Sequence, residues 1–165
     1  MSLSEQQFRA LLSNFATGIT IVSCQDNQGR KIGATINSFS SVSLKPPLVL
    51  FSLAHDTYWR DALLAADTLA ISMLAADQTA ISNRFAVPGP DHWQGIDAPM
   101  TPRGAPLIPG HIGALECQIS QQIPAGDHVI ALCQVTKLIA GSDAAPLIYF
   151  RSTYQNLSAP ADQGG

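Results

Sequence analysis

Apolar residues at helical spacing open the chain. Four large apolar side chains follow the i, i+3, i+4, i+7 pattern of an amphipathic helix: Phe8, Leu11, Leu12 and Phe15. Ser4 can cap the first turn, with Gln7 three residues further on. Gly18 is placed where such a helix can end. We therefore expect a helix between Ser4 and Gly18.

Short runs of branched and aromatic residues then recur along the chain. Residues 19–24 and the run that begins at Lys31 are typical of strands, and the polar residues 26–29 form a turn between them. Two short strands with a tight link form a hairpin, which favours antiparallel pairing. Further strands are predicted at residues 48–53, 69–74, 114–123, 128–139 and 147–150.

Two short helices separate some of these strands. One helical face carries Trp59, Ala62, Leu63 and Ala66. Asp56 or Thr57 is the expected cap of this helix, and Asp77 the cap of a second helix that carries Phe85. Residues 88–110 are rich in Pro and Gly and predict a long irregular surface segment. About seven strands without strict alternation of strands and helices predict a mainly antiparallel β barrel or sandwich.

Composition limits the classes of protein and of partner. The 165 residues suffice for one domain, which we expect over residues 1–157, with a polar disordered tail at 158–165. A net charge of −3 without a basic tract argues against nucleic acid or an anionic membrane as partner. The start of the chain lacks the pattern of a signal peptide, and no apolar run approaches the ~20 residues of a spanning helix. We expect a cytoplasmic protein.

Charged residues make up only 13% of the chain, about half of the usual share of roughly 25%. So few charges indicate that part of the surface is covered by something else. The three cysteines are widely spaced and include no Cys-x-x-Cys pair, so we expect buried thiols rather than disulfides or a zinc site. The four histidines form no pair at ligand spacing, and no metal site is predicted.

Residues 35–43 are the most unusual local feature. The segment holds Thr35, Asn37, Ser38, Ser40, Ser41 and Ser43 without a single charge. Such a segment can present hydroxyl, amide and backbone N–H groups to a ligand. It can equally be a Ser-rich loop whose hydroxyls satisfy its own backbone.

Two further features carry the same ambiguity. His128 begins an apolar strand just after a turn, where it could lie at the rim of a barrel and titrate near neutral pH, or be a structural histidine beside Asp127. Arg84 could hold a phosphate and Phe85 could form the wall of an aromatic site. The alternative is a surface arginine next to a core phenylalanine.

Taken in order, these segments resemble the flavin reductase-like family, the short-chain FMN-binding split barrels. This family includes reductase components of two-component flavin-dependent monooxygenases. The resemblance runs from about Phe8 to Tyr154, and its most specific motif is Asn-Ser-Phe-Ser-Ser-Val-Ser-Leu-x-Pro-Pro, beginning at Asn37. Other matching segments are residues 15–22, Asn-Arg-Phe-Ala at 83–86, Ala-Gly-Asp-His at 125–128 and residues 146–150.

The resemblance implies a Greek-key split barrel that is a homodimer and holds FMN or FAD at the subunit boundary. By similarity, Thr35, Asn37 and Ser38 would lie along the flavin ring and ribityl chain. Backbone and hydroxyl groups of Ser41, Val42 and Ser43 would contact the flavin. By the same similarity, the remaining predicted site residues are Thr57, Arg84 and Phe85 toward the phosphate and His128 near the nicotinamide of NADH or NADPH.

One segment departs from the family pattern. Where many relatives carry a small Ser/Thr pair that holds the phosphate, this chain has His-Asp-Thr-Tyr-Trp at residues 55–59. Asp56 would repel a nearby phosphate, and the choice between FMN and FAD stays open. Trp59 either packs in the core or stacks on a ring, and its helical spacing favours the core.

The resemblance implies an NAD(P)H-dependent flavin reductase that supplies reduced flavin to a partner monooxygenase. An alternative is a tight flavin-binding electron carrier or sensor without efficient turnover. A split-barrel interaction protein without flavin is a third hypothesis, and the intact segment 35–43 argues against it.

Overall fold

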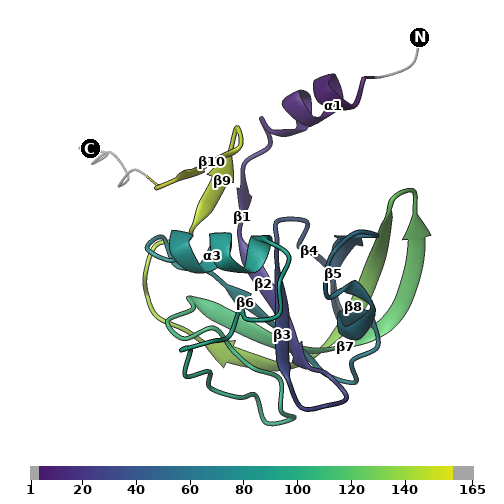
Figure 1. Cartoon of the computed structure of the whole chain (residues 1–165), viewed down its shortest axis with the longest axis vertical. Helices are drawn as coiled ribbons and strands as arrows, with labels where there is room; N and C mark the ends of the chain where they lie inside the picture. Colours follow the sequence, from purple (N-terminus) through teal and green to yellow (C-terminus); the bar gives the residue numbers. More distant parts are fainter. Residues whose placement is uncertain (1–3, 158–165) are drawn as a thin grey trace.

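The computed structural model describes residues 4–157, so the tail predicted at 158–165 lies outside the described residues. Most strands belong to one seven-stranded sheet of order β3-β2-β6-β7-β8-β5-β4, in which all neighbours are antiparallel. This sheet curls around the core (Figure 1). Its strands are β2 (Thr20–Gln25), β3 (Lys31–Ile36), β4 (Ser40–Leu44), β5 (Pro47–Ala54), β6 (Leu69–Met73), β7 (Gly113–Ala125) and β8 (His128–Ala140).

A second, three-stranded sheet has the order β1-β9-β10. Its strands are β1 (Thr17–Gly18), β9 (Ile148–Phe150) and β10 (Thr153–Gln155). The helices are α1 (Glu5–Leu12), α2 (Arg60–Leu64) and α3 (Thr79–Ala86). The prediction of a mainly antiparallel β barrel with a few short helices is confirmed. No helix among residues 4–157 is long and apolar enough to cross a membrane.

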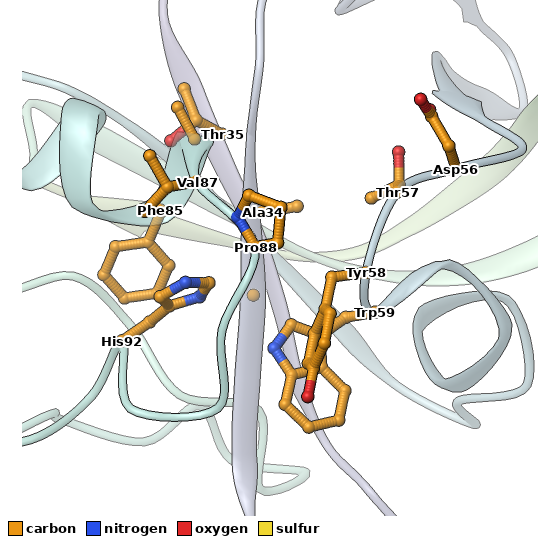
Figure 2. A pocket seen from close by; sticks show the side chains of 12 residues that line it. Ala34, Thr35, Asp56, Thr57, Tyr58, Trp59, Phe85, Val87, Pro88 and His92 are labelled. Carbon is orange, nitrogen blue, oxygen red and sulfur yellow. The ribbon is translucent and has the colours of Figure 1, made fainter.

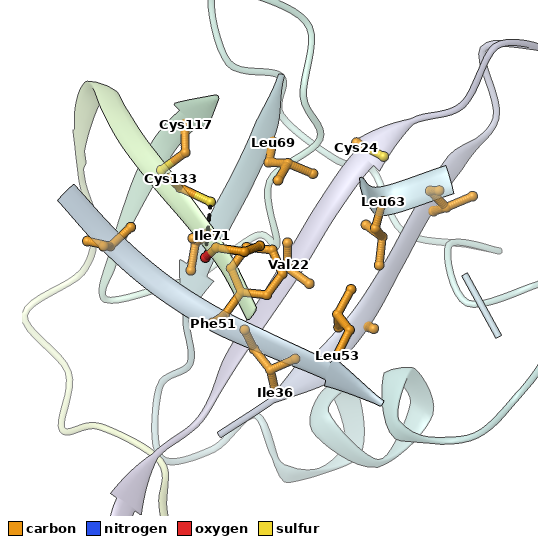
Figure 3. Packing of buried hydrophobic residues seen from close by; sticks show 14 residues of the cluster. Val22, Cys24, Ile36, Phe51, Leu53, Leu63, Leu69, Ile71, Cys117 and Cys133 are labelled. Carbon is orange, nitrogen blue, oxygen red and sulfur yellow. Dashed lines mark hydrogen bonds between the residues drawn. The ribbon is translucent and has the colours of Figure 1, made fainter. Parts of the chain in front are cut away.

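Alternating strand residues fill the main core. Val22, Phe51 and Ile71 from three different strands meet there with less than 1% of their surface exposed (Figure 3). Leu63 of α2 closes this cluster from one side. Burying such side chains contributes about 1.5–3 kcal/mol each, so the curled sheet is held mainly by this interior.

The three cysteines are buried free thiols, as predicted. Burial raises the pKa of Cys24, Cys117 and Cys133 to about 12, with a smaller contribution at Cys24 from the negative charge of Asp26. A thiol that stays protonated is a poor nucleophile and a poor metal ligand. These residues therefore act as small core side chains.

The prediction for the first helix is correct at its start and wrong at its end. The side chain of Ser4 accepts a hydrogen bond from the Gln7 backbone N–H, but α1 ends at Leu12 and Gly18 belongs to strand β1. The Asn14 side-chain amide donates to the carbonyl oxygens of Ala10 and Leu11, which closes the last turn early. None of the residues of α1 is buried, and the helix projects away from the barrel (Figure 1).

The predicted caps of the two inner helices are wrong. Trp59 precedes α2 and Gln78 precedes α3, and neither makes a side-chain capping hydrogen bond. Residues 54–57 first form a turn, with Thr57 N–H donating to Ala54 O, so α2 begins one turn later than its pattern indicates. In place of a cap, Gln78 accepts from Ala75 N–H and donates to Pro109 O.

Candidate functional site

The loop that follows β5 lies between two clefts. The larger, the His128 cleft, has a volume of about 960 Å³, and its lining includes Phe15, Asn37, His55, Asp56, His128 and Tyr149. The smaller, the Trp59 cleft, has about 240 Å³, and its lining includes Thr35, Asp56, Thr57, Trp59, Phe85 and His92 (Figure 2). Asp56 contributes to both, so the loop forms the partition between them.

A third cleft adjoins the His128 cleft. It has about 310 Å³, is mostly apolar, and shares Phe15 and Asn37 with its larger neighbour. Phe39, Met73 and Leu147 contribute to its wall. Asn37 therefore stands where a large cleft of mixed polar and apolar lining meets a mostly apolar one, a setting that suits a flat ligand with one polar edge.

His128 is positioned by the β7–β8 hairpin. Gly126, with φ +64°, makes the turn, and His128 begins β8 opposite Ala125 of β7 and Ala54 of β5. The side chain of His128 is 42% exposed. Its Nδ1 lies 2.7 Å from Asp127 Oδ1. A carboxylate can only accept, so Nδ1 carries a proton and Nε2 is left for a ligand.

Asp127 in turn responds to His128. The hydrogen bond from His128 and then its charge lower the pKa of Asp127 below the ordinary value, with a further small contribution from His55. The backbone N–H of His55 donates to Asp127 O at 2.9 Å, which ties the loop after β5 to the β7–β8 turn. Two histidines and a carboxylate are thus brought to one end of the His128 cleft by segments far apart in the sequence.

Several hydroxyls of residues 35–43 already have partners within the protein. Thr35 Oγ1 donates to Ser82 O at 2.7 Å. Ser38 Oγ donates to Ser52 O and accepts from Ser52 N–H, both at 2.9 Å, and Ser43 Oγ accepts from Lys45 N–H. These hydroxyls thus follow the second alternative, in which the side chains of the segment hydrogen-bond to the protein's own backbone. The hydroxyls hold the segment against β5 and α3 while their remaining lone pairs stay available.

The segment is also more regular than a loop. Thr35 ends up within β3, and Ser41, Val42 and Ser43 form part of β4, a strand at the edge of the sheet. Between Ser41 and Ser43 the register with β5 shifts, so Val42 is an extra residue in the ladder and is 48% exposed. An edge strand leaves backbone N–H and C=O groups unpaired, and a bulge in it turns a side chain in a new direction.

Phe85 and Arg84 differ in role. Phe85 is 2% exposed and packs edge-on against Trp93 at 5.0 Å between ring centroids, so it is both a core residue and the floor of the Trp59 cleft. Arg84 lines none of the three clefts, and its Nη2 donates to Asp91 O at 3.0 Å and to Gln94 O. Its Nε and Nη1 make no such bond within residues 4–157.

The structure therefore sorts the predicted site residues. Asn37 and His128 meet in one cleft, and Thr35, Thr57 and Phe85 meet in the other. Ser38, Ser41, Val42, Ser43 and Arg84 line none of the three clefts, and their contacts with a ligand stay predictions. Trp59 packs partly against the core and also lines the smaller cleft, with its Nε1 donating to Gly89 O at 3.1 Å.

Comparison with protein families matches residues 12–158 to the flavin reductase like domain. The chain belongs to the flavin reductase-like family. The fold and the family together define the class, which is that of flavin oxidoreductases built on an antiparallel barrel.

Individual relatives extend this result. The chain is similar to "FMN reductase (NADH) SmoA" of Agrobacterium fabrum, with 37% identity over 94% of this chain and 87% of the relative. It is similar to the reductase subunit HsaB of a flavin-dependent monooxygenase of Rhodococcus jostii, with 30% identity over 94% of this chain and 80% of the relative. Among solved structures, the NADH:FAD oxidoreductase SgcE6 of Streptomyces globisporus, in complex with NAD and FAD fragments, superposes with a TM-score of 0.89 at 32% identity, covering 98% of this chain and all of that one, 100%.

Proposed function

We propose that the protein transfers hydride from NADH or NADPH to FMN or FAD and supplies the reduced flavin to a partner monooxygenase. The observation that carries this proposal is the His128 cleft. There, Asn37 from the uncharged segment 35–43 and the exposed His128 from the β7–β8 turn line one space of about 960 Å³. That volume lies at the upper end of the range of roughly 300–1,000 Å³ for small-molecule sites.

The chemistry of the lining fits a flavin beside a nicotinamide. A flavin is a flat, mostly uncharged heterocycle whose pyrimidine edge is matched by amide and hydroxyl groups. When bound, the flavin accepts the hydride and the nicotinamide supplies it, so the reaction itself belongs to these two groups. The chain has to bind the flavin and the nicotinamide, orient them toward each other and exclude water. It needs no paired acid and base of its own.

Individual residues take the following roles in this proposal. Asn37 and the fixed hydroxyls of Thr35 and Ser38 lie along the flavin ring and ribityl chain. The bulged edge strand offers backbone and hydroxyl groups from Ser41, Val42 and Ser43. The phosphate end lies toward Thr57, Arg84 and Phe85, and His128 contacts the nicotinamide nucleotide through Nε2.

We also infer a homodimer whose interface borders the His128 cleft. Helix α1 buries none of its residues in the subunit, although it carries large apolar side chains. Phe8, Leu11, Leu12 and Phe15 are between 52% and 76% exposed. Phe8, Leu12 and Phe15 also line the His128 cleft. An apolar surface of this kind is typical of an interface, and a second subunit that covers it would complete the wall of the cleft.

The proposed partner and location follow from the same evidence. HsaB is a reductase subunit of a flavin-dependent monooxygenase, which supports a monooxygenase as the acceptor of reduced flavin for this chain. Three buried thiols in free form suit a reducing compartment such as the cytoplasm.

Flavin binding and steady-state oxidation of NADH test the function together. The purified protein is titrated with FMN and with FAD, and NADH and NADPH oxidation is then followed at saturating flavin. We expect oxidation that depends on both flavin and protein. Tight flavin binding with no oxidation above the buffer rate would favour an electron carrier or sensor instead.

A further inference from the structure

His92 is a buried histidine without an internal hydrogen-bond partner. The residue is 6% exposed, and neither Nδ1 nor Nε2 has a partner among residues 4–157. Buried polar side chains in proteins are nearly always hydrogen-bonded, and an exception calls for an explanation. His92 lies in the irregular segment 88–110, to which the sequence attaches no chemistry.

The position of His92 points to a ligand. The ring lies beside Phe85, at 5.2 Å between centroids, on one side of the Trp59 cleft, with Thr57 and Asp56 on the opposite side (Figure 2). The cleft, at about 240 Å³, is smaller than the usual range of roughly 300–1,000 Å³ for a whole ligand. It therefore fits the tail of a ligand whose ring system lies in the larger neighbouring cleft.

Few hydrogen-bond donors face this cleft. Thr35 Oγ1 donates to Ser82 O, and Trp59 Nε1 donates to Gly89 O. Among the lining side chains of the described residues, the donors left are the hydroxyls of Thr57 and Tyr58 and the ring N–H of His92. A phosphate needs several donors, and Asp56 disfavours it on the opposite wall. His92 is the donor remote from Asp56.

The neighbouring Arg84 fixes the turn that carries His92. Its Nη2 donates to the carbonyl oxygens of Asp91 and Gln94, which flank His92 on both sides in sequence. Gly89 covers the Nε2 side of the ring, where an added Cβ would lie 3.7 Å from that nitrogen. Both ring nitrogens are buried in the subunit, so a hydrogen bond to a ligand requires the imidazole to turn toward the cleft while its backbone stays held.

We propose that His92 donates a hydrogen bond to the phosphate group of the bound flavin in the Trp59 cleft. This inference rests on the proposed function, because it assigns the phosphate end of the flavin to a residue of the same site. Riboflavin lacks that phosphate and serves as the matched ligand. His111 serves as the matched residue, since it is 8% exposed, has an unpartnered Nδ1 and lines none of the three clefts.

The test compares binding of FMN and riboflavin by fluorescence quenching in three variants. His92→Phe keeps an aromatic ring beside Phe85 and is expected to raise the Kd for FMN about tenfold, the effect of losing one hydrogen bond to a charged group. The Kd for riboflavin is expected to stay within about twofold of the wild type. His92→Gln, which retains a donor, should preserve most of the FMN affinity, and His111→Phe should change neither Kd.

Other outcomes overturn the inference. Equal changes for FMN and riboflavin, or no change for either, would show that His92 is only a packing residue. An increase in the KM for NADH with an unchanged Kd for FMN would place the phosphate of the nicotinamide nucleotide there instead. A wild type that binds neither flavin refutes the proposed function rather than the role of His92 alone.

A measurement on the unaltered protein covers the case in which His92→Phe does not fold. In NMR spectra of the histidine ring nitrogens, FMN should shift the resonances of His92 and leave those of His111 in place. Riboflavin should leave both in place. A His92 signal that FMN does not move contradicts the inference.

Discussion

At the scale of single residues, the Asp127–His128 pair determines which ring nitrogen of His128 is free to bind a ligand in the His128 cleft. Asp127 Oδ1 accepts a hydrogen bond from His128 Nδ1, with 2.7 Å between the two atoms, so the histidine offers Nε2 to a ligand. We predict that His128→Ala raises the KM for the nicotinamide nucleotide by about tenfold and the KM for flavin much less. Steady-state kinetics with each substrate varied in turn check this prediction.

The neighbouring carboxylate supplies the control for that experiment. Asp127→Asn can still accept from Nδ1 but lacks the charge, so its effect should be smaller than that of His128→Ala and fall on the same substrate. If His128→Ala changed the KM for flavin as much as the KM for the nicotinamide nucleotide, the placement of His128 beside the nicotinamide would be wrong.

Gly33 sets the position of Phe85 beneath the Trp59 cleft. A Cβ at residue 33 would lie 3.1 Å from Phe85 Cε1 and 3.1 Å from Val22 O, closer than nearly all ordinary contacts. We predict that Gly33→Ala lowers the free energy of unfolding by about 1–3 kcal/mol, because the buried ring has little room to yield. Gly29→Ala is not a suitable control, since φ is +74° there, whereas Gly18→Ala meets no atom within 4 Å. Denaturant unfolding of Gly33→Ala and Gly18→Ala compares the two, and equal stabilities would contradict the packing argument.

At the scale of elements, the long strands were predictable and the ends of helices were not. The runs at 114–123 and 128–139 appear as β7 and β8, because two long apolar runs around a Gly turn have few alternatives. Strand β1 has only two residues, and polar residues outnumber apolar ones in β4 and β10, so none of the three shows a strand pattern. Segment 35–43 looked like a loop because clusters of Ser, Thr and Asn are typical of loops, yet residues 35–36 belong to β3 and residues 40–43 to β4.

A single buried carboxylate ties the irregular segment to the sheet. Glu116 of β7 is 2% exposed and accepts from Arg103 N–H at 2.9 Å and from Thr136 Oγ1 at 3.0 Å. Burial alone would raise the pKa of Glu116, but hydrogen bonds from Thr101, Arg103 and Thr136 outweigh it and lower the pKa. Glu116 therefore stabilises the fold fully above its unfolded pKa, and this contribution is lost as the pH falls through the lower folded value.

We predict that Glu116→Gln lowers the free energy of unfolding at neutral pH by about 2 kcal/mol, since it replaces hydrogen bonds to a charge by weaker ones. The loss should shrink as the pH falls below the ordinary range of a glutamate. Urea unfolding of both proteins over a pH series measures it. If the difference in the free energy of unfolding between wild type and variant does not become smaller in acid, the charge of Glu116 is not the cause of the stabilisation.

At the scale of the whole molecule, the exposed apolar face of α1 accounts for part of the small share of charged residues. Only 13% of the residues are charged, and the large apolar side chains of α1 are exposed rather than packed on the barrel. The sequence pattern correctly indicated an amphipathic helix, but it could not say whether the apolar face meets its own subunit or another. That distinction depends on tertiary geometry.

We predict that the protein is a dimer in solution, by light scattering after gel filtration, and that Leu11→Glu shifts it toward monomer. The side chain of Leu11 is exposed and α1 buries none of its residues in the subunit, so the variant should keep its secondary structure by circular dichroism, although loss of the dimer contacts should lower its melting temperature. Gln6→Glu on the same helix adds the same single negative charge at an exposed polar position and is the control for a change of charge alone. A wild-type monomer would remove the proposed interface.

Some residues of the candidate site could be predicted from the sequence, and others could not. Asn37, Thr35, Thr57, Phe85 and His128 come from short motifs whose residue types suit a flavin, and the barrel brings them into two adjoining clefts. His92 carries no such signal, because its importance lies in burial without a partner, which only coordinates reveal. The internal bonds of Ser38 and Arg84 were equally invisible in the sequence.

The most direct test of the central claim is a mixture of the wild-type protein, NADH and FMN in the absence of oxygen. We predict that NADH and oxidised FMN, each followed by its own absorbance band, are lost together in equal molar amounts, far faster than in buffer, with FAD and NADPH tested in parallel. No loss of either band above the buffer rate, with any pairing of the two flavins and the two nicotinamides, would contradict it.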